Sequence, residues 1–120
     1  MQNFRDLRAW TKAHRLVLDV YRATTSFPRC ELYGLTSQIR RSAVSIPSNI
    51  AEGSKRQHPA DFAHFLNMSE ASAAEVEYLC MVSRDLGYAS AEAQKPLSSE
   101  IDDISRMLHA LRTKVQQGAE

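Results

Sequence analysis

Residues 97–115, LSSEIDDISRMLHALRTKV, carry the clearest structural pattern in the chain. Their large apolar residues recur at alternating spacings of four and three. That period keeps one stripe of an α-helix turned toward a partner helix. The stripe consists of Leu97, Ile101, Ile104, Leu108, Leu111 and Val115. This stretch therefore predicts a long helix packed against other helices.

Three upstream segments show the same helical periodicity. The residue before Pro28 disfavours the α region, so the first helix ends there. Pro47 predicts a kink rather than a break in the second, because the apolar stripe continues in phase to Ile50. Gly53 and Gly87 are placed to end the second and third helices. The predicted helices cover about 6–26, 35–53, 59–86 and 90–116.

The fold class that follows is all-α, an antiparallel up-down-up-down four-helix bundle. Short connectors force neighbouring helices to run antiparallel. A chain of 120 residues with 43% hydrophobic and 24% charged residues has room for one domain, 1–120, around one core. No strand-like alternation of apolar and polar residues competes with the helical pattern.

The cysteines and the apolar runs indicate a cytoplasmic protein. Cys30 and Cys80 share no motif, which suits free thiols in a reducing compartment. The N-terminus lacks the basic-then-apolar pattern of a secretory signal. No apolar run approaches the ~20 residues that a membrane span needs, so no membrane partner is expected.

The charge is unevenly divided along a chain whose net charge is only +1. Residues 1–56 carry ten Lys or Arg against four acids, and residues 57–120 carry five against ten. One interpretation is a basic surface and an acidic surface on the same molecule. The other is that the two halves neutralise each other within the fold.

The residues that catalysis requires do not converge in the sequence, so no catalytic residue, metal or cofactor is expected. A di-iron bundle needs Glu-x-x-His motifs, and the nearest pattern runs from Asp61 to His64 with the wrong acid. Arg8 and His14 match the spacing of helical ribonucleases of the HEPN type. Six residues along a helix leave them ~120° apart, which makes this a remote alternative.

A second, polar stripe runs along the predicted second helix at spacings of three and four. A helix with an apolar stripe and an ordered polar stripe is typical of one that serves its own core and a neighbour. A solvated face is the plainer explanation of the same pattern. The stripe consists of Gln38, Arg41, Ser45, Ser48 and Glu52.

The same helix carries the segment Ser45-Ile46-Pro47-Ser48-Asn49-Ile50-Ala51-Glu52-Gly53. With Trp10, Phe27-Pro28, Tyr33-Gly34-Leu35 and Gln38-Ile39-Arg40-Arg41, it resembles the 23S rRNA intervening sequence proteins, a four-helix bundle family. The resemblance extends over nearly the whole chain. It implies a bundle that assembles as a ring, typically a pentamer.

The chain is also similar to the accessory protein of diversity-generating retroelements, a pentameric barrel that binds nucleic acid and a reverse transcriptase. That protein is strongly basic, unlike this chain. We therefore expect first a non-catalytic, ring-forming protein that binds a macromolecule, and second a nucleic-acid-binding accessory protein. The residues expected at the subunit interface are Gln38, Arg41, Ser45, Ser48, Asn49, Glu52, Glu75 and Glu77. Those expected to bind nucleic acid are Arg40, Arg41, Lys55, Arg56, Arg5 and Arg8.

Overall fold

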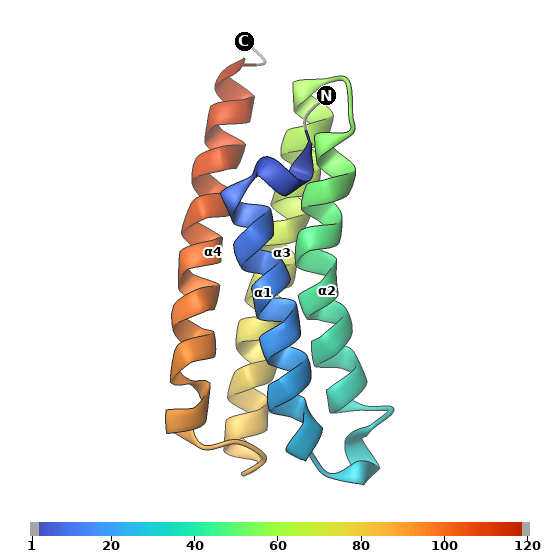
Figure 1. The fold of residues 1–120 in the computed structure, drawn as a ribbon, viewed down its shortest axis with the longest axis vertical. Helices are drawn as coiled ribbons and strands as arrows, with labels where there is room; N and C mark the ends of the chain where they lie inside the picture. Colours follow the sequence, from blue (N-terminus) through green and yellow to red (C-terminus); the bar gives the residue numbers. More distant parts are fainter. Residues whose placement is uncertain (1–2, 119–120) are drawn as a thin grey trace.

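The computed structural model describes residues 3–118, so residues 1–2 and 119–120 of the predicted domain lie outside it. Within that range the chain forms four α-helices and no β-strand (Figure 1). The helices are α1 (Arg8–Ala23), α2 (Leu35–Ser54), α3 (Pro59–Asp85) and α4 (Ala91–Gly118). Short 3-10 turns cover Phe4–Asp6, Thr24–Ser26 and Arg29–Glu31. The prediction of an all-helical chain with four helices is confirmed.

The helices lie side by side along a molecule that measures 48 × 24 × 20 Å. α2 packs against α1 and α3, and α4 packs against α3 and α1, so α1 and α3 occupy opposite corners. Figure 1 shows the α1–α2 and α3–α4 connectors at one end and the α2–α3 connector at the other. The outer faces of α1 and α3 therefore point in different directions.

The predicted stripe of α4 lies against the core. Its first four members, from Leu97 to Leu108, are buried, and Leu111 and Val115 are partly buried against the same cluster. Burial of each such side chain contributes about 1.5–3 kcal/mol to folding. The other helices contribute Leu16, Val20, Ile46, Ile50, Leu66 and Val76, all fully buried.

α1 is shorter than predicted at both ends. Leu7 has an extended backbone (φ −85°, ψ 124°) that separates the turn at Phe4–Asp6 from the helix, so α1 begins at Arg8 and not at Asp6. At the other end α1 stops at Ala23 and tightens into the Thr24–Ser26 turn. Phe27 then turns extended (ψ 152°), as the residue before proline should.

α2 runs unbroken through Pro47, as predicted, while the kink there stays a prediction. The expectation that Gly53 ends the helix is wrong, because α2 continues to Ser54 and Gly53 is buried inside it. A Cβ on Gly53 would lie 2.7 Å from Phe65 Cβ and 2.9 Å from Phe62 Cδ1. This glycine is thus required for the close approach of α2 and α3 and not for a turn.

Gly87 does end α3, as predicted. Its φ of 80° is the left-handed conformation that glycine adopts readily. The Gly87 N–H donates to the Arg84 carbonyl and the Tyr88 N–H to the Ser83 carbonyl, both at 2.9 Å. This pair of bonds satisfies carbonyls at the helix end. α4 then begins after Ser90, whose Oγ accepts from the Ala93 N–H at 3.0 Å.

Candidate interaction surfaces

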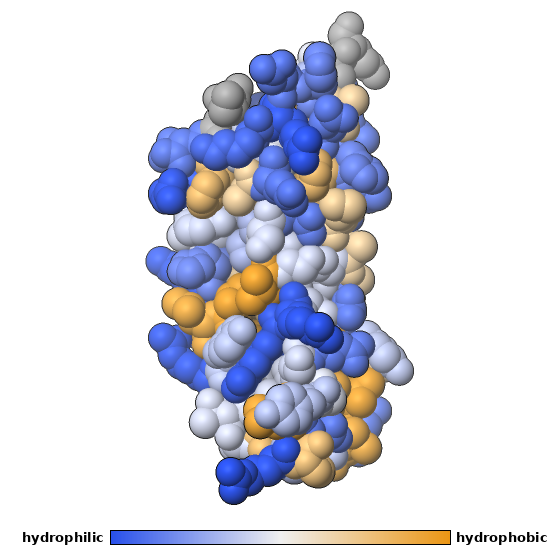
Figure 2. All heavy atoms as spheres, turned by 90° about the vertical axis from the view of Figure 1, so that its right-hand side faces the viewer, coloured by the Kyte–Doolittle hydropathy of each residue, from blue (hydrophilic) through white to orange (hydrophobic). Residues whose placement is uncertain are grey.

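A shallow groove of about 380 Å³ lies between α1 and α2, and we call it the α1–α2 groove. Trp10 lies in it and contacts two other rings, Phe4 at 5.0 Å and His14 at 5.1 Å between centroids. Figure 2 shows hydrophobic side chains exposed between polar ones on the face that α2 presents. The groove is lined by Phe4, Trp10, His14, Val17, Val44, Pro47, Ser48 and Ala51.

The α2 side of this groove has basic residues at both ends. Val44, Ser48 and Ala51 follow one another at spacings of four and three, and Arg41 and Lys55 continue that row in the two directions. Both basic residues are exposed. At 1.5 Å per residue they lie roughly 21 Å apart along the helix. The groove is therefore an apolar strip with a positive charge at each end.

The N-terminal turn adds further positive charge at the Lys55 end. The Phe4 ring has the Arg5 guanidinium 4.6 Å from its centroid and the Lys55 ammonium at 5.6 Å. Arg56 lies over the Phe65 ring at 4.7 Å. Arg8, at the start of α1, is exposed. Of the residues expected to bind nucleic acid, the structure brings Arg5 and Lys55 together around one aromatic ring.

Arg40 has a different environment from its neighbour Arg41. Its Nε donates to Thr24 Oγ1 at 2.8 Å and its Nη2 donates to the Tyr21 carbonyl at 3.3 Å. Its guanidinium also lies 4.7 Å from the centre of the Tyr21 ring. A cation at the C-terminal end of a helix meets the negative end of the helix dipole. Arg40 thus fastens α2 to the end of α1, whereas Arg41 projects into solvent.

The residues of the predicted polar stripe of α2 also fall into two groups, some exposed to solvent and others bonded within the chain. Gln38, Arg41, Ser48 and Glu52 are exposed. Ser45 and Asn49 are only partly exposed and are bonded within the chain. Ser45 Oγ lies 2.8 Å from Ser72 Oγ of α3, and Asn49 Nδ2 donates to Ser45 Oγ at 3.0 Å. Ser45 therefore joins α2 to α3, and Asn49 donates to Ser45 from within α2.

The outer side of α3 carries a stripe that the sequence interpretation missed, and we call it the α3 seam. It consists of Ala71, Ala74, Tyr78 and Met81, at spacings of three, four and three. All four are exposed, with Tyr78 at 59% and Met81 at 45%. In the sequence, the indication of this stripe was that residues of α3 are apolar on more than one face of the helix. Such a pattern indicates burial on more than one side.

Acidic residues surround the α3 seam. Glu75 and Glu77 are exposed beside it, and Asp85 lies four residues beyond Met81 on the same row. Glu70 differs, because Arg112 of α4 binds it through Nε and Nη2. That hydrogen bond raises the pKa of Arg112 above its ordinary value. Glu70 is thus used inside the chain, and the exposed acids near the α3 seam are the other three.

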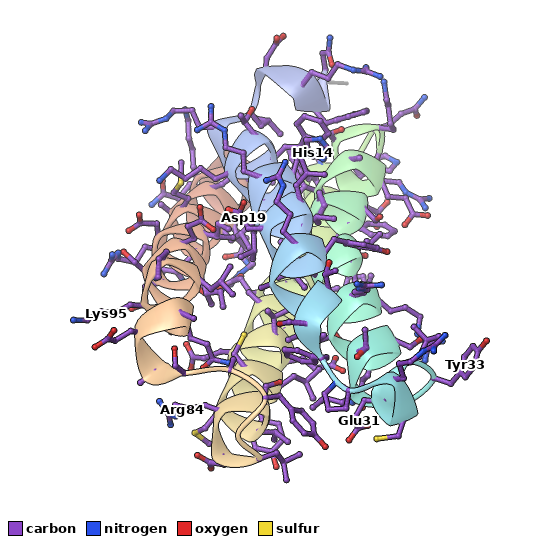
Figure 3. All side chains as sticks on the ribbon, turned by 60° about the horizontal axis from the view of Figure 1, so that its bottom comes forward. His14, Asp19, Glu31, Tyr33, Arg84 and Lys95 are labelled. Atoms are coloured by element: carbon purple, nitrogen blue, oxygen red, sulfur yellow. The ribbon has the colours of Figure 1, made fainter. Side chains whose placement is uncertain are left out.

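A carboxyl pair lies between α1 and α4. Oε2 of Glu100 is shielded from solvent and meets no hydrogen-bond partner among residues 3–118. Burial, followed by the nearby Asp19 carboxyl, raises the pKa of Glu100 above its usual value. Two carboxylates have only acceptor atoms, so this contact needs a shared proton. Figure 3 shows Asp19 on the side of α1 that faces α4.

The remaining candidates for chemistry do not form a site. α1 places Arg8 and His14 roughly 9 Å apart along its axis and ~120° apart around it. The His14 ring is stacked on Trp10 with an angle of 5° between the planes. Within the described part of the chain, no group of three or more His, Cys, Asp or Glu is arranged to hold a metal ion. No helix described here is long and apolar enough to cross a membrane.

The chain is thus an all-helical protein of four long helices. Its candidate functional features are two exposed surfaces, the α1–α2 groove and the α3 seam. The family model described as 23S rRNA-intervening sequence protein matches residues 5–110. The chain belongs to that family, which confirms the resemblance seen in the sequence. A search of curated proteins finds no match.

Proposed function

We propose that this chain is a non-catalytic, antiparallel up-down-up-down bundle of one domain, and the subunit of a homo-oligomeric ring. In this ring the α1–α2 groove of one subunit receives the α3 seam of the next. The alternation of connectors between the two ends supports the antiparallel arrangement. Its two free thiols suit a reducing cytoplasm. Five subunits is the number that the family resemblance implies.

The observation that carries the proposal is the match between two exposed surfaces. The groove offers an apolar strip with Arg41 and Lys55 at its ends. The seam offers an apolar row with Glu75, Glu77 and Asp85 around it. An exposed apolar patch rimmed by charge is typical of a protein–protein contact. Opposite charges at the rims favour the correct pairing and register.

The positions of the two surfaces favour a ring over a two-fold dimer. α1 and α3 occupy opposite corners of the bundle, so the groove and the seam do not share one face. A contact between two different surfaces is head-to-tail. It closes into a ring when the rotation that relates neighbouring subunits is a whole fraction of 360°. Ala71 and Ala74 are small, so the helices of neighbouring subunits can approach closely there.

Light scattering at micromolar concentration tests the assembly. We expect a mass of about five times the 13.5 kDa chain, and a monomeric mass would rule the ring out.

Tyr78→Asp places a charge in the seam and should give monomers. Tyr78 is 59% exposed in the single chain. Its replacement should therefore change the free energy of unfolding by no more than ~0.5 kcal/mol.

Tyr33→Asp is the matched control. Tyr33 is 94% exposed and projects away from the α1–α2 connector (Figure 3). It belongs to neither surface, so the variant should keep the mass of the unaltered protein. Equal dissociation by both substitutions would mean that the seam is not the contact.

Nucleic-acid binding is the second candidate function, and the basic end of the groove favours it. Arg5 and Lys55 flank Phe4, with Arg56 three residues after the buried Gly53. Cations beside a partly exposed ring are the kind of groups that bind phosphates and stack bases in single-stranded RNA. The net charge of +1 means that such binding would depend on this local cluster.

Fluorescence anisotropy with a labelled single-stranded RNA tests this second function. Binding should weaken steeply between about 50 and 200 mM salt, because released counterions drive it. The double variant Arg5→Ala, Lys55→Ala should reduce the salt slope by about one to two. Arg84→Ala, at the far end of α3, is the control and should leave the slope unchanged. Absence of any signal at the lower salt would exclude the function.

A further inference from the structure

A cavity of about 440 Å³ lies at the end of the molecule where α1 stops and the α3–α4 connector turns. Its volume falls within the ~300–1,000 Å³ that small-molecule sites occupy. Its walls come mainly from the end of α1, the connector and the first turns of α4, with Ile39 of α2 and Cys80 of α3, and it shares no residue with the α1–α2 groove or the α3 seam. The residues on which its chemistry depends are Val20, Phe27, Cys80, Tyr88, Gln94 and Leu97.

Two aromatic rings form part of the wall. The centroids of Phe27 and Tyr88 lie 5.7 Å apart, with 51° between the ring planes. Tyr88 is held in place because its hydroxyl donates to Glu31 Oε2 at 2.9 Å. That hydroxyl is therefore engaged outside the cavity, and Tyr88 contributes its ring. Aromatic walls favour a flat, apolar occupant, because rings stack or pack edge to face.

Gln94 supplies a buried polar group of the cavity. Only 6% of this residue is exposed, and its Nε2 donates to the Cys80 carbonyl at 2.7 Å. A carbonyl only accepts, so this bond fixes which end of the amide is nitrogen. No donor among residues 3–118 is paired with Gln94 Oε1. Oε1 is not among the side-chain atoms shielded from solvent without a partner, so it is open to the cavity and can accept a hydrogen bond from a ligand donor.

Cys80 also lines the cavity and indicates binding without covalent chemistry. Burial, with a smaller contribution from Glu77, raises the pKa of its thiol to about 11. The thiolate is the nucleophilic form of cysteine, so at neutral pH this side chain acts as a small apolar group. The cavity thus has apolar and aromatic walls, a fixed acceptor at Gln94, and further polar side chains in its lining from Arg22, Thr24, Ser26 and Ser90.

We propose that this cavity is a binding site for a small, flat aromatic molecule that donates one hydrogen bond to Gln94 Oε1. The site is formed within a single subunit, so the proposal does not depend on the ring. Phenol and toluene are suitable probes, because they have nearly the same shape and only phenol carries a donor.

Titration of the ¹⁵N-labelled protein with each probe, followed by amide chemical shifts, tests the site. Saturable shifts confined to residues around the cavity are expected at millimolar concentrations. Gln94→Met keeps nearly the same side-chain length and removes the acceptor. The ratio of toluene to phenol dissociation constants should fall about three- to tenfold in this variant, the range for loss of one hydrogen bond.

Ala93→Phe is a second variant, which fills the cavity from the first turn of α4 and should abolish binding of both probes. Circular dichroism checks that each variant is folded. An unchanged ratio in Gln94→Met, or no saturable shift with either probe in the unaltered protein, would overturn the proposal. Undiminished binding to Ala93→Phe would overturn it as well, because the probe would then bind elsewhere.

Discussion

Gly53 lies where no larger residue fits, although nothing in its conformation requires glycine. It is inside α2, and the nearest atoms to a Cβ there belong to Phe62 and Phe65 of α3. These atoms lie so near because α2 and α3 pack closely at the one point where α2 has no side chain. Loss of this gap should force the helices apart or distort a phenylalanine rotamer.

Gly53→Ala should therefore destabilise the protein by about 1–3 kcal/mol, as overpacking of a tight core does. Urea unfolding followed by circular dichroism measures the change. Gly118→Ala is the matched control, because no atom lies within 4 Å of a Cβ at that position. Equal stability of the two variants would show that α2 and α3 can move apart without cost.

Glu100 is the residue whose ionisation opposes folding. Its folded-state pKa is raised, first by burial and then by Asp19. Its stabilising contribution is therefore complete below about pH 4, the range in which a free glutamate is protonated. That contribution is lost as the pH rises through the raised pKa, because the ionised side chain is poorly solvated and faces a second carboxylate.

Glu100→Gln should be more stable than the unaltered protein at pH 7, because glutamine donates to Asp19 without carrying a charge. The side chain is partly exposed to solvent, so the gain should be only about 0.5–1 kcal/mol. Urea unfolding at pH 4 and pH 7 measures it, and the gain should shrink at the lower pH. Asp102→Asn, on the exposed face of α4, is the control. A gain that is equal at both pH values would contradict the shared proton.

Among the elements, the junction of α1 and α2 depends on one side chain. Arg40 binds Thr24 and the Tyr21 carbonyl at the end of α1, while the adjacent Arg41 has no such role and is exposed. Loss of a charged hydrogen bond at a helix C-terminus leaves carbonyls of that helix without a partner. The two adjacent arginines therefore have different parts in the molecule.

Arg40→Ala should lower the free energy of unfolding by about 1–2 kcal/mol, whereas Arg41→Ala should change it by less than ~0.5 kcal/mol. The comparison is best made in a Tyr78→Asp background, in which we expect monomers, so that assembly does not contribute to stability. Similar values for the two variants would indicate that the Arg40 contacts are lost in solution.

The whole molecule has two exposed surfaces, the α1–α2 groove and the α3 seam, that one chain cannot bring together. Arg41 lies at one end of the α1–α2 groove, and Glu77 lies beside the α3 seam. In the proposed ring such residues meet across subunits. Charges at the rim of a contact set its salt dependence and its choice of partner more than its total strength.

Arg41→Glu should weaken assembly by about 1 kcal/mol per contact, or roughly fivefold in the dissociation constant, because it adds a negative charge opposite an acidic rim. The combined variant Arg41→Glu, Glu77→Arg should recover part of the loss. Analytical ultracentrifugation at low and high salt measures both effects, which should shrink as salt increases. Arg22→Glu, on α1 and outside the groove, is the control.

The sequence by itself determined the four helices, because helical periodicity and the residues that end a helix are local properties. Gly87 correctly indicated the end of α3, and the stripe from Leu97 to Val115 was correct along its length. Pro28 indicated where helical structure stops, although α1 itself ends at Ala23 and a 3-10 turn covers Thr24–Ser26. The end of α2 was wrongly predicted at Gly53. This glycine is required instead by its contacts with Phe62 and Phe65, which lie about ten residues further along the chain.

Tertiary structure alone decided which apolar residues outside the predicted core stripes remained exposed. Tyr78 and Met81 follow the same helical spacing as core residues, and only the placement of α1 at the opposite corner leaves them in solvent. Likewise, Arg40 and Arg41 are equivalent in the sequence until the end of α1 arrives beside one of them. The physical reason is that burial and hydrogen bonding depend on residues distant in the chain, which no local pattern contains.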